Sequence, residues 1–415
     1  METHLAAWIS ATPQGREADA ILRACVHCGF CNATCPTYQL LGDELDGPRG
    51  RIYQIKRVLE GAAATRSTQV HLDRCLTCLG CETTCPSGVQ YGRLLEIGRE
   101  VVDARVARPP AERLSRAALR AGLTRPALFA LALRLGRAVR PLLPAALRAK
   151  LIARRDPGPA PSLGQRRRVL LLTSCTQDAL LPSIDRAAAR VLAALGVEAI
   201  TEPRAGCCGA VRAHLGDPAG ALDAARRNVD AWSAPLAAGA EALVMTASGC
   251  GIRVRDYGRL LADDPGYAER ARQVSERTID LAEWLWAELA TLVPLAAAPA
   301  VRRVAFHAPC TLQHGLKLKG RVEEILHALG LELTPVPDAH LCCGSAGAYS
   351  ILQPTISKEL KRAKLAALGS GEPDVIASAN IGCIMHLSDG ANAPVRHWIE
   401  LLDARMVGSG PRAPL

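Results

Sequence analysis

Eight cysteines near the N-terminus have the spacing of a metal-cluster site. They form two runs, each followed by a proline: Cys25, Cys28, Cys31, Cys35 and Cys75, Cys78, Cys81, Cys85. Each run matches the pattern C-x2-C-x2-C-x3-C-P, which ligates [4Fe–4S] clusters. Three closely spaced cysteines present their sulfurs to one cluster, whereas the fourth points away and ligates the other cluster.

This crossing of the fourth cysteine predicts two ligand sets. The sets are Cys25, Cys28, Cys31 and Cys85, and Cys75, Cys78, Cys81 and Cys35. Structural zinc sites instead use two pairs of ligands across a longer gap. Disulfides need an oxidising compartment, and we expect no export signal at the start of this chain. We therefore predict two [4Fe–4S] clusters.

Length and composition limit the other possibilities. A chain of 415 residues predicts two to four domains, on a prior of about 100–200 residues each. Apolar residues make up 49% and aromatic residues 3%, so the cores consist mainly of Ala, Leu and Val. We find no run of 18 uncharged apolar residues and expect no transmembrane helix. We expect a cytoplasmic protein.

The cysteine runs must be positioned by helices. Apolar residues at Ile52, Ile55, Val58 and Leu59 have helical spacing, and a second such pattern follows the second run. Two helices beside two cluster loops predict an α-helical ferredoxin-type domain over residues 1–103.

A basic segment follows over residues 104–168. It contains 16 Lys+Arg residues but only Glu112 and Asp156 as acidic residues. Arg113, Arg116 and Arg120 share one predicted helical face. We interpret the segment as a helical linker, either a solvated connector or a surface for anionic lipid or an acidic partner. The confinement of positive charge to this segment, together with few aromatic residues, argues against nucleic-acid binding.

The rest of the chain contains an internal repeat. The two copies, residues 169–300 and 301–415, carry matching cysteines: Cys175, Cys207, Cys208, Cys250 and Cys310, Cys342, Cys343, Cys383. In each copy, predicted strands alternate with helices, which indicates a small parallel α/β domain. The predicted fold class is therefore α+β multidomain: a helical ferredoxin-type domain, a helical linker and two repeated cysteine-rich α/β domains.

Each repeat offers four thiols that converge on one site if the strands are parallel, because ligands gather at strand ends in open α/β sheets. Adjacent cysteines make poor disulfides. Gly209 and Gly344 follow the adjacent pairs and allow close backbone approach. These eight cysteines are candidate redox groups or ligands of an additional metal or cluster, and the spacing does not decide between the two. We find no sequence motif for flavin, nucleotide or substrate binding.

The arrangement of these motifs resembles the iron–sulfur subunit of glycolate oxidase. The segments that carry the resemblance most strongly are Cys28–Tyr38, Gly47–Ile52 and His71–Gly88. The resemblance implies partner subunits that carry FAD and oxidise glycolate to glyoxylate. This chain would relay their electrons to a quinone or another acceptor, in peripheral contact with the cytoplasmic face of the inner membrane. No catalytic residue is then expected here.

Related families supply the alternatives. They are the iron–sulfur subunits of D-lactate and glycerol-3-phosphate dehydrogenases, and heterodisulfide reductase-like thiol–disulfide enzymes. In heterodisulfide reductase-type modules, a fifth cysteine follows the last one in a Cys-x-x-Cys pair. Arg253 and His386 occupy that position here, which argues against the unusual non-cubane cluster of those modules.

Overall fold

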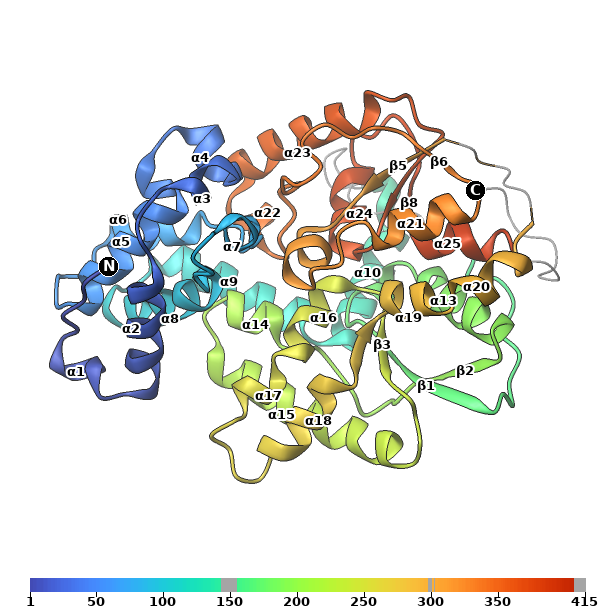
Figure 1. The fold of residues 1–415 in the computed structure, drawn as a ribbon, viewed down its shortest axis with the longest axis horizontal. Helices are drawn as coiled ribbons and strands as arrows, with labels where there is room; N and C mark the ends of the chain where they lie inside the picture. Colours follow the sequence, from blue (N-terminus) through green and yellow to red (C-terminus); the bar gives the residue numbers. More distant parts are fainter. Residues whose placement is uncertain (143–154, 298–300, 302, 407–415) are drawn as a thin grey trace. The chain divides into compact units, whose positions relative to one another are not determined.

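The chain folds into two compact units. The computed structural model describes residues 1–142, 155–297, 301 and 303–406. Unit 1 comprises Met1–Arg116 and His340–Lys364, and unit 2 comprises Ala117–Ala339 and Leu365–Leu415 (Figure 1). The predicted fold class is confirmed, because helices dominate and two small parallel sheets follow the N-terminal helical part.

Unit 1 is helical throughout its described residues. Its N-terminal part contains α1 (Ala7–Ser10), α2 (Pro13–Ala24), α3 (Phe30–Ala33), α4 (Pro36–Leu41), α5 (Pro48–Leu59), α6 (Arg66–Asp73), α7 (Gly80–Thr84), α8 (Tyr91–Arg105) and the start of α9 (Pro110–Leu123). The segment from His340 to Lys364 adds α22 (Tyr349–Leu352) and most of α23 (Pro354–Gly369). The helices expected on either side of the second cysteine run are thus α5 and α8.

Helices α5 and α8 form the core that supports the cysteine loops. Ile55 and Leu59 of α5, and Leu94 and Ile97 of α8, are fully buried in one apolar cluster. Burial of each such side chain contributes about 1.5–3 kcal/mol. At Gly98 the helices approach so closely that an added Cβ would lie 2.6 Å from Ile55. The core therefore fixes the segments that lead into and out of both cysteine runs.

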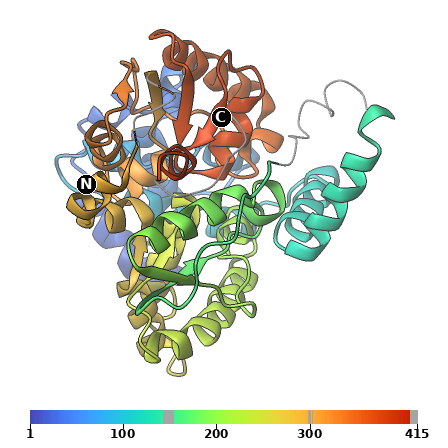
Figure 2. The same ribbon diagram turned by 90° about the vertical axis from the view of Figure 1, so that its right-hand side faces the viewer.

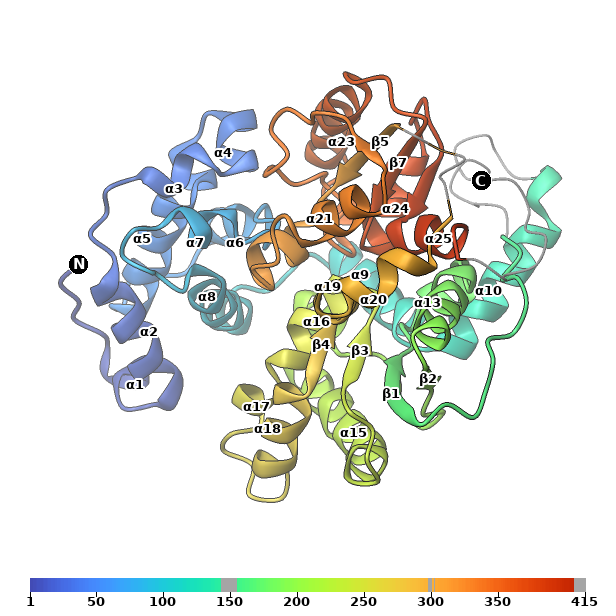
Figure 3. The same cartoon turned by 45° about the vertical axis from the view of Figure 1, so that its right-hand side comes forward.

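Unit 2 begins with a four-stranded parallel sheet in the order β2-β1-β3-β4 (Figure 3). Its strands are β1 (Arg167–Leu172), β2 (Val197–Ile200), β3 (Leu243–Met245) and β4 (Thr278–Asp280). Leu170 of β1 pairs with Leu243 of β3, and both are buried. The chain runs from β1 outward to β2 and then returns past β1 to β3, so β1 and β3 flank a topological switch point.

Helices flank this sheet, as expected for parallel strands joined by crossovers. They are α12 (Gln177–Leu180), α13 (Ser183–Ala194), α14 (Ala210–His214), α15 (Pro218–Ala237), α16 (Ser248–Arg255), α17 (Tyr257–Leu260), α18 (Ala268–Glu276), α19 (Leu281–Ala287) and α20 (Leu289–Leu292). Right-handed crossovers that reverse direction at the switch point place α13 and α15 on opposite faces.

A second parallel sheet repeats this topology in the order β6-β5-β7-β8. Its strands are β5 (Arg303–His307), β6 (Glu332–Leu333), β7 (Val375–Ser378) and β8 (Val395–His397), and the helices that unit 2 places around it include α21 (Arg321–Ala328), α24 (Ile381–Ser388) and α25 (Trp398–Asp403). The strands predicted from the repeated cysteine pattern are therefore present in both copies.

The basic segment differs from its prediction at one residue. Helices α9 and α10 (Pro126–Ala138) are present in this segment (Figure 2). Arg137 Nη2 of α10 donates to the Leu180 carbonyl of α12 at 3.3 Å. Arg116, however, is buried and pairs with Asp73 at 3.1 Å and with Glu112 at 3.3 Å. It therefore does not belong to an exposed basic face. The predicted linker residues 143–154 lie outside the described part.

Candidate iron–sulfur and thiol sites

The two N-terminal cysteine runs share one loop conformation. His27 and Gly29 in the first run, and Thr77 and Leu79 in the second, have positive φ angles between 53° and 89°. Left-handed residues at equivalent positions turn the chain sharply and direct successive backbone N–H groups inward, a geometry that suits anionic sulfur clusters. His27 and Thr77 thus occupy equivalent left-handed turn positions in the two runs.

The first group of cysteines lies around one cavity. Cys25, Cys28 and Cys31 line it from the first run, and Cys85 lines it from the second. Burial raises the pKa of Cys31 to about 11, and the neighbouring Cys25, Cys28 and Cys85 raise it further. Four thiols around one cavity match the donor set of a cubane cluster. Because ligation requires thiolates, metal loading here must release protons.

The second group forms beside it. Burial raises the pKa of Cys81 well above its usual range, and the nearby Cys78, Cys75 and Cys35 add to this shift. Cys35 therefore approaches the second run, as Cys85 approaches the first. Cys81 also lines the cavity of the first group, so the two groups adjoin within unit 1.

Polar contacts orient the sulfurs of the second group. The Thr77 backbone N–H donates to Cys75 Sγ at 3.4 Å, and the buried Tyr91 hydroxyl donates to the same sulfur at 3.5 Å. Thr37 Oγ1 lies 3.2 Å from Cys35 Sγ. Hydrogen bonds to ligand sulfurs are among the factors that set the reduction potential of an iron–sulfur cluster. Motif spacing did not reveal Thr37 and Tyr91, because neither belongs to the cysteine pattern.

The two groups differ in exposure. Cys28 of the first group is exposed, and its neighbours Val26 and Phe30 are 68% and 62% exposed. Cys35 and Cys81 of the second group are buried. Cys25 of the first group is buried as well, so the difference lies in Cys28, because the second group has no exposed cysteine.

One segment of the second cysteine-rich repeat belongs to unit 1. In it, the Gly344 backbone N–H donates to Cys342 Sγ at 3.4 Å, and the Ser357 hydroxyl donates to the Gly344 carbonyl at 2.8 Å. The Tyr349 hydroxyl donates to the carbonyl of Arg74, next to Cys75, at 2.9 Å. Tyr349 therefore joins the segment that carries Cys342 and Cys343 to the second cysteine group.

The four cysteines of the first repeat converge in unit 2. Cys175 follows β1, Cys250 begins the helix after β3, and the adjacent Cys207 and Cys208 come from the loop after β2. Cys207 is within hydrogen-bonding reach of Cys175 and Cys208, and Cys208 also reaches Cys250. The site lies at the switch point of the sheet, where ligand sites occur in this topology.

Proton sharing in this group lowers the pKa values of two thiols, Cys207 and Cys250, the latter through a hydrogen bond from Cys208. Hydrogen bonds from the thiols of Cys175 and Cys208 lower the pKa of Cys207 to about 3 despite its burial, with further help from the Gly209 backbone N–H and from Arg212. The same hydrogen bonds raise the pKa values of Cys175 and Cys208. Buried sulfurs with lowered pKa values among neighbouring thiols can ligate a metal or take part in thiol chemistry.

Side chains from neighbouring helices hold the Cys207–Cys208 loop. Asn228 accepts from the Gly206 N–H at 2.8 Å and donates to the Cys207 carbonyl at 3.2 Å, while the Tyr257 hydroxyl donates to the Cys208 carbonyl at 2.9 Å. Gly209 has φ = +87°, and a Cβ there would lie 2.8 Å from the Ala221 carbonyl oxygen. Close backbone approach at this glycine is thus confirmed, whereas no sequence signal pointed to Asn228 or Tyr257.

The second repeat is distributed differently. Cys342 and Cys343 belong to unit 1, and Cys310 and Cys383 belong to unit 2. Within unit 2, Nδ1 of the buried His307 forms a hydrogen bond with Ser378 Oγ at 3.0 Å. One ring nitrogen of His307 also lies within 4.8 Å of Cys383 Sγ. In the first repeat α14 begins directly after Gly209, whereas after Gly344 the next helix begins only at Tyr349.

Three segments of the chain match known protein families. Residues 21–89 match the 4Fe-4S dicluster domain family, and residues 169–255 and 304–388 each match the cysteine-rich domain family. The chain is therefore an iron–sulfur protein with a dicluster domain followed by two cysteine-rich domains.

Two full-length relatives identify the family. The glycolate oxidase iron–sulfur subunit of Escherichia coli (strain K12) is 52% identical over 406 residues, covering 97% of this chain and 98% of that protein. The probable glycolate oxidase iron–sulfur subunit of Bacillus subtilis (strain 168) is 30% identical over 415 residues, covering 91% and 92%. The chain belongs to the family of glycolate oxidase iron–sulfur subunits, as its motifs predicted.

More distant matches share parts of this architecture. Lactate utilization protein A of Bacillus velezensis is 29% identical over 247 residues, which cover 57% of this chain and 100% of that protein. A crystal structure of a hypothetical protein from Helicobacter pylori has a TM-score of 0.53 at 11% identity, covering 96% of this chain and 74% of that one. The latter shows likeness of fold alone.

Proposed function

We propose that this chain is the electron-transfer subunit of a complex that oxidises glycolate to glyoxylate. The observation that carries the proposal is the pair of adjoining four-cysteine groups in a chain 52% identical to a glycolate oxidase iron–sulfur subunit along almost its whole length. Partner subunits that carry FAD perform the substrate chemistry. This chain contributes the cluster ligands and the protein interior through which electrons pass, and it contributes no catalytic residue.

The eight N-terminal cysteines are the proposed cluster ligands. Cys25, Cys28, Cys31 and Cys85 hold one [4Fe–4S] cluster, and Cys75, Cys78, Cys81 and Cys35 hold the other. Each cluster, when bound, accepts and releases single electrons. The neighbours of two cysteines support these sets. Cys31 has the other three members of its proposed set nearby, including Cys85 from the second run. Cys81 likewise has the other three members of its set nearby, including Cys35 from the first run.

The exposure of the two groups suggests the direction of transfer. The first group, with exposed Cys28, is accessible to a donor subunit. The second group has no exposed cysteine and is joined through Tyr349 to the segment with Cys342 and Cys343. We propose that electrons enter at the first group and leave by way of the second, toward a quinone or another acceptor.

A lipid-soluble acceptor requires contact with a membrane surface. No described helix is both long and apolar enough to cross a bilayer. We propose peripheral contact through the exposed arginines of residues 104–168, among them Arg113, because basic residues near an anionic leaflet contribute about 1 kcal/mol each. Arg116 is excluded from this role by its burial.

The cysteine-rich repeats are proposed as additional redox or metal sites. The first repeat brings Cys175, Cys207, Cys208 and Cys250 together, and the lowered pKa of Cys207 makes it readily available as a thiolate. A heterodisulfide reductase-like activity of the isolated chain remains the second candidate function, because this converged thiol group favours it. Disulfide reduction by the chain without partner subunits would support that candidate.

The decisive experiment separates substrate chemistry from electron relay. The chain is co-expressed with its partner subunits, purified anaerobically and supplied with glycolate, while flavin bleaching and quinone-analogue reduction are followed together. Cys28→Ser should leave flavin bleaching intact and abolish quinone-analogue reduction. Unchanged quinone-analogue turnover in this variant would refute the relay function. If D-lactate or glycerol 3-phosphate is a better substrate than glycolate, the chain is instead the iron–sulfur subunit of the corresponding dehydrogenase.

A further inference from the structure

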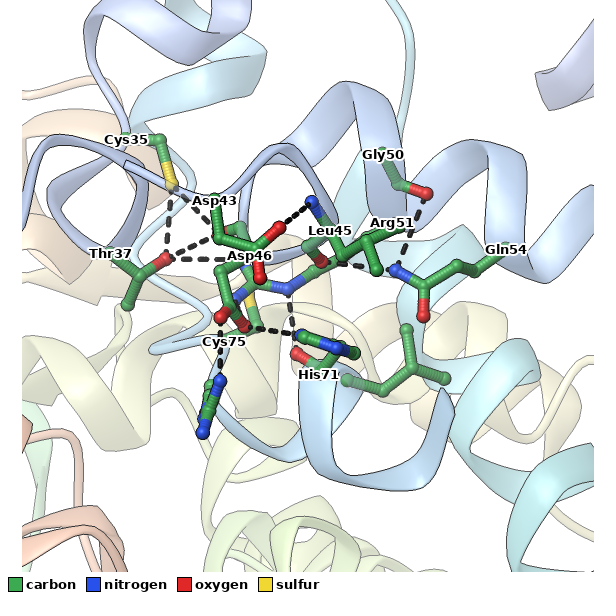
Figure 4. A network of polar contacts seen from close by, with 12 residues as sticks. Cys35, Thr37, Asp43, Leu45, Asp46, Gly50, Arg51, Gln54, His71 and Cys75 are labelled. Carbon is green, nitrogen blue, oxygen red and sulfur yellow. Dashed lines mark hydrogen bonds and ion pairs between the residues drawn. The ribbon is translucent and has the colours of Figure 1, made fainter. Parts of the chain in front are cut away.

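A buried arginine lies beside the second cysteine group. Arg51 of α5 is fully buried, and its guanidinium makes three hydrogen bonds (Figure 4). Nε donates to the His71 carbonyl at 2.8 Å, Nη1 to Thr37 Oγ1 at 3.1 Å and Nη2 to Asp46 Oδ1 at 3.3 Å. These contacts fix the position of the charge, because a guanidinium held by three acceptors cannot rotate away.

The surrounding charges leave this site positive. Asp46 is fully buried, and its other oxygen accepts from Arg74 at 2.7 Å, so one carboxylate faces two guanidiniums. His71 Nδ1 lies 3.0 Å from Asp46 Oδ1 and adds no negative charge. Asp43 also approaches this group, but it is exposed, so solvent screens its carboxylate. Arg51, Arg74 and Asp46 together carry a net positive charge, in which Arg51 is the fully buried cation. The Arg74 side chain is 32% exposed, so solvent screens part of its charge.

A hydroxyl connects this charge to a cluster ligand. Thr37 Oγ1 accepts from Arg51 and has one proton to donate, either to the Asp46 carbonyl at 2.8 Å or to Cys35 Sγ at 3.2 Å. A thiolate at Cys35 attracts that proton, and Arg51 polarises the hydroxyl that gives it. Burial disfavours the charge on Arg51, but the nearby Tyr91, Cys75, Cys35 and Asp46 outweigh it and raise its pKa.

The first cysteine group has a different neighbour. Arg49 is the arginine beside Cys31, but its side chain is 35% exposed and pairs with Glu44 at 2.6 Å. Solvent and the carboxylate together reduce its field at the sulfurs. Among the described residues that line the cavity of the first group, no arginine is buried as Arg51 is.

We propose that Arg51 is a positioning residue that raises the reduction potential of the second-group cluster above that of the first. Reduction adds a negative charge, which a fixed cation in a low-dielectric interior stabilises. Electrons then run downhill from the first group, which contains the exposed Cys28, to the second group, which has no exposed cysteine. The inference rests on the proposed electron relay and adds that Arg51 sets the direction of electron transfer between the two clusters.

Potentiometric titration monitored by electron paramagnetic resonance tests this role on the full chain loaded with iron and sulfide. Arg51→Met should lower the one-electron reduction constant of one cluster at least tenfold, which corresponds to about 59 mV, and leave the other cluster unchanged. Arg51→Lys retains the charge and should recover at least half of this shift. Arg49→Met, the matched control in the same helix, should leave the second-group cluster unaffected.

Two further variants keep the test decisive. Cys28→Ser disrupts the first ligand set, so the remaining signal identifies the second-group cluster. Thr37→Val keeps Arg51 in place but removes the hydroxyl, and it should lower the same potential even if Arg51→Met does not fold. Potentials that stay unchanged in Thr37→Val and Arg51→Met, or a shift confined to the first-group cluster, would overturn the inference. Failure of the complex to oxidise glycolate would instead refute the proposed function and leave the potentials as measured.

Discussion

His397 connects the two cysteine-rich repeats and should make their stability depend on pH. It ends β8, caps α25 by accepting the Ile399 backbone N–H at Nδ1 (3.2 Å), and donates from Nε2 to the carbonyl of Thr246, after β3, at 2.9 Å. Burial lowers its pKa from 6.5 to about 4, and Arg155 adds to this, although Glu400 and the Thr246 bond oppose it. The folded protein therefore holds His397 neutral.

The sign and size of the effect follow from this shift. The pKa is depressed on folding, so the stability is fully present above pH 6.5 and is lost as pH falls from 6.5 through 4. A shift of between two and three units corresponds to about 3 kcal/mol in total, of which about 2 kcal/mol should be lost by pH 5. Protonation would also remove the acceptor that caps α25.

Denaturant unfolding of the full chain at pH 7.5 and pH 5.0, followed by tryptophan fluorescence, measures this loss. Trp398 is buried next to His397 and reports on the relevant region. His397→Asn should lower stability at pH 7.5 but remove about 2 kcal/mol of the difference between the two pH values. His4→Asn, at an exposed histidine, is the control and should change nothing. An identical pH difference in His397→Asn and the unmodified chain would refute this reasoning.

Three further outcomes are expected. Cys85→Ser should reduce bound iron from about eight atoms to about four and remove the cluster of the first group rather than that of its own run; loss of the second-group signal instead would contradict the crossed ligation. Tyr257→Phe should loosen the adjacent-cysteine loop and shift the alkylation of Cys207, followed by mass spectrometry, to higher pH; an unchanged profile would show that the loop needs no such support. Arg116→Glu should destabilise the chain by about 3–5 kcal/mol, because it opposes the buried Asp73, and a thermal melt that matches the unmodified protein would show that this pair is not formed.

The sequence by itself determined the local features of this protein. The spacing of each N-terminal cysteine run depends on a few consecutive residues, so the two cluster loops and a crossed set of ligands could be predicted from it. The strands before Cys175 and Cys310 were evident because short apolar runs end at matching positions in both repeats. Helical periodicity likewise indicated α5, since its buried residues recur on one face.

Only the tertiary structure decided which side chains meet across the chain. Periodicity placed Arg116 on a helical face with Arg113 but could not show that Asp73, 43 residues earlier, lies against it. The same holds for Tyr349 and Arg74, which are 275 residues apart. The net charge around Arg51 depends on Asp46 and Arg74 being brought together by separate helices. Such contacts depend on the packing of distant segments, which a local pattern does not encode, and they set the electrostatics of the cysteine groups.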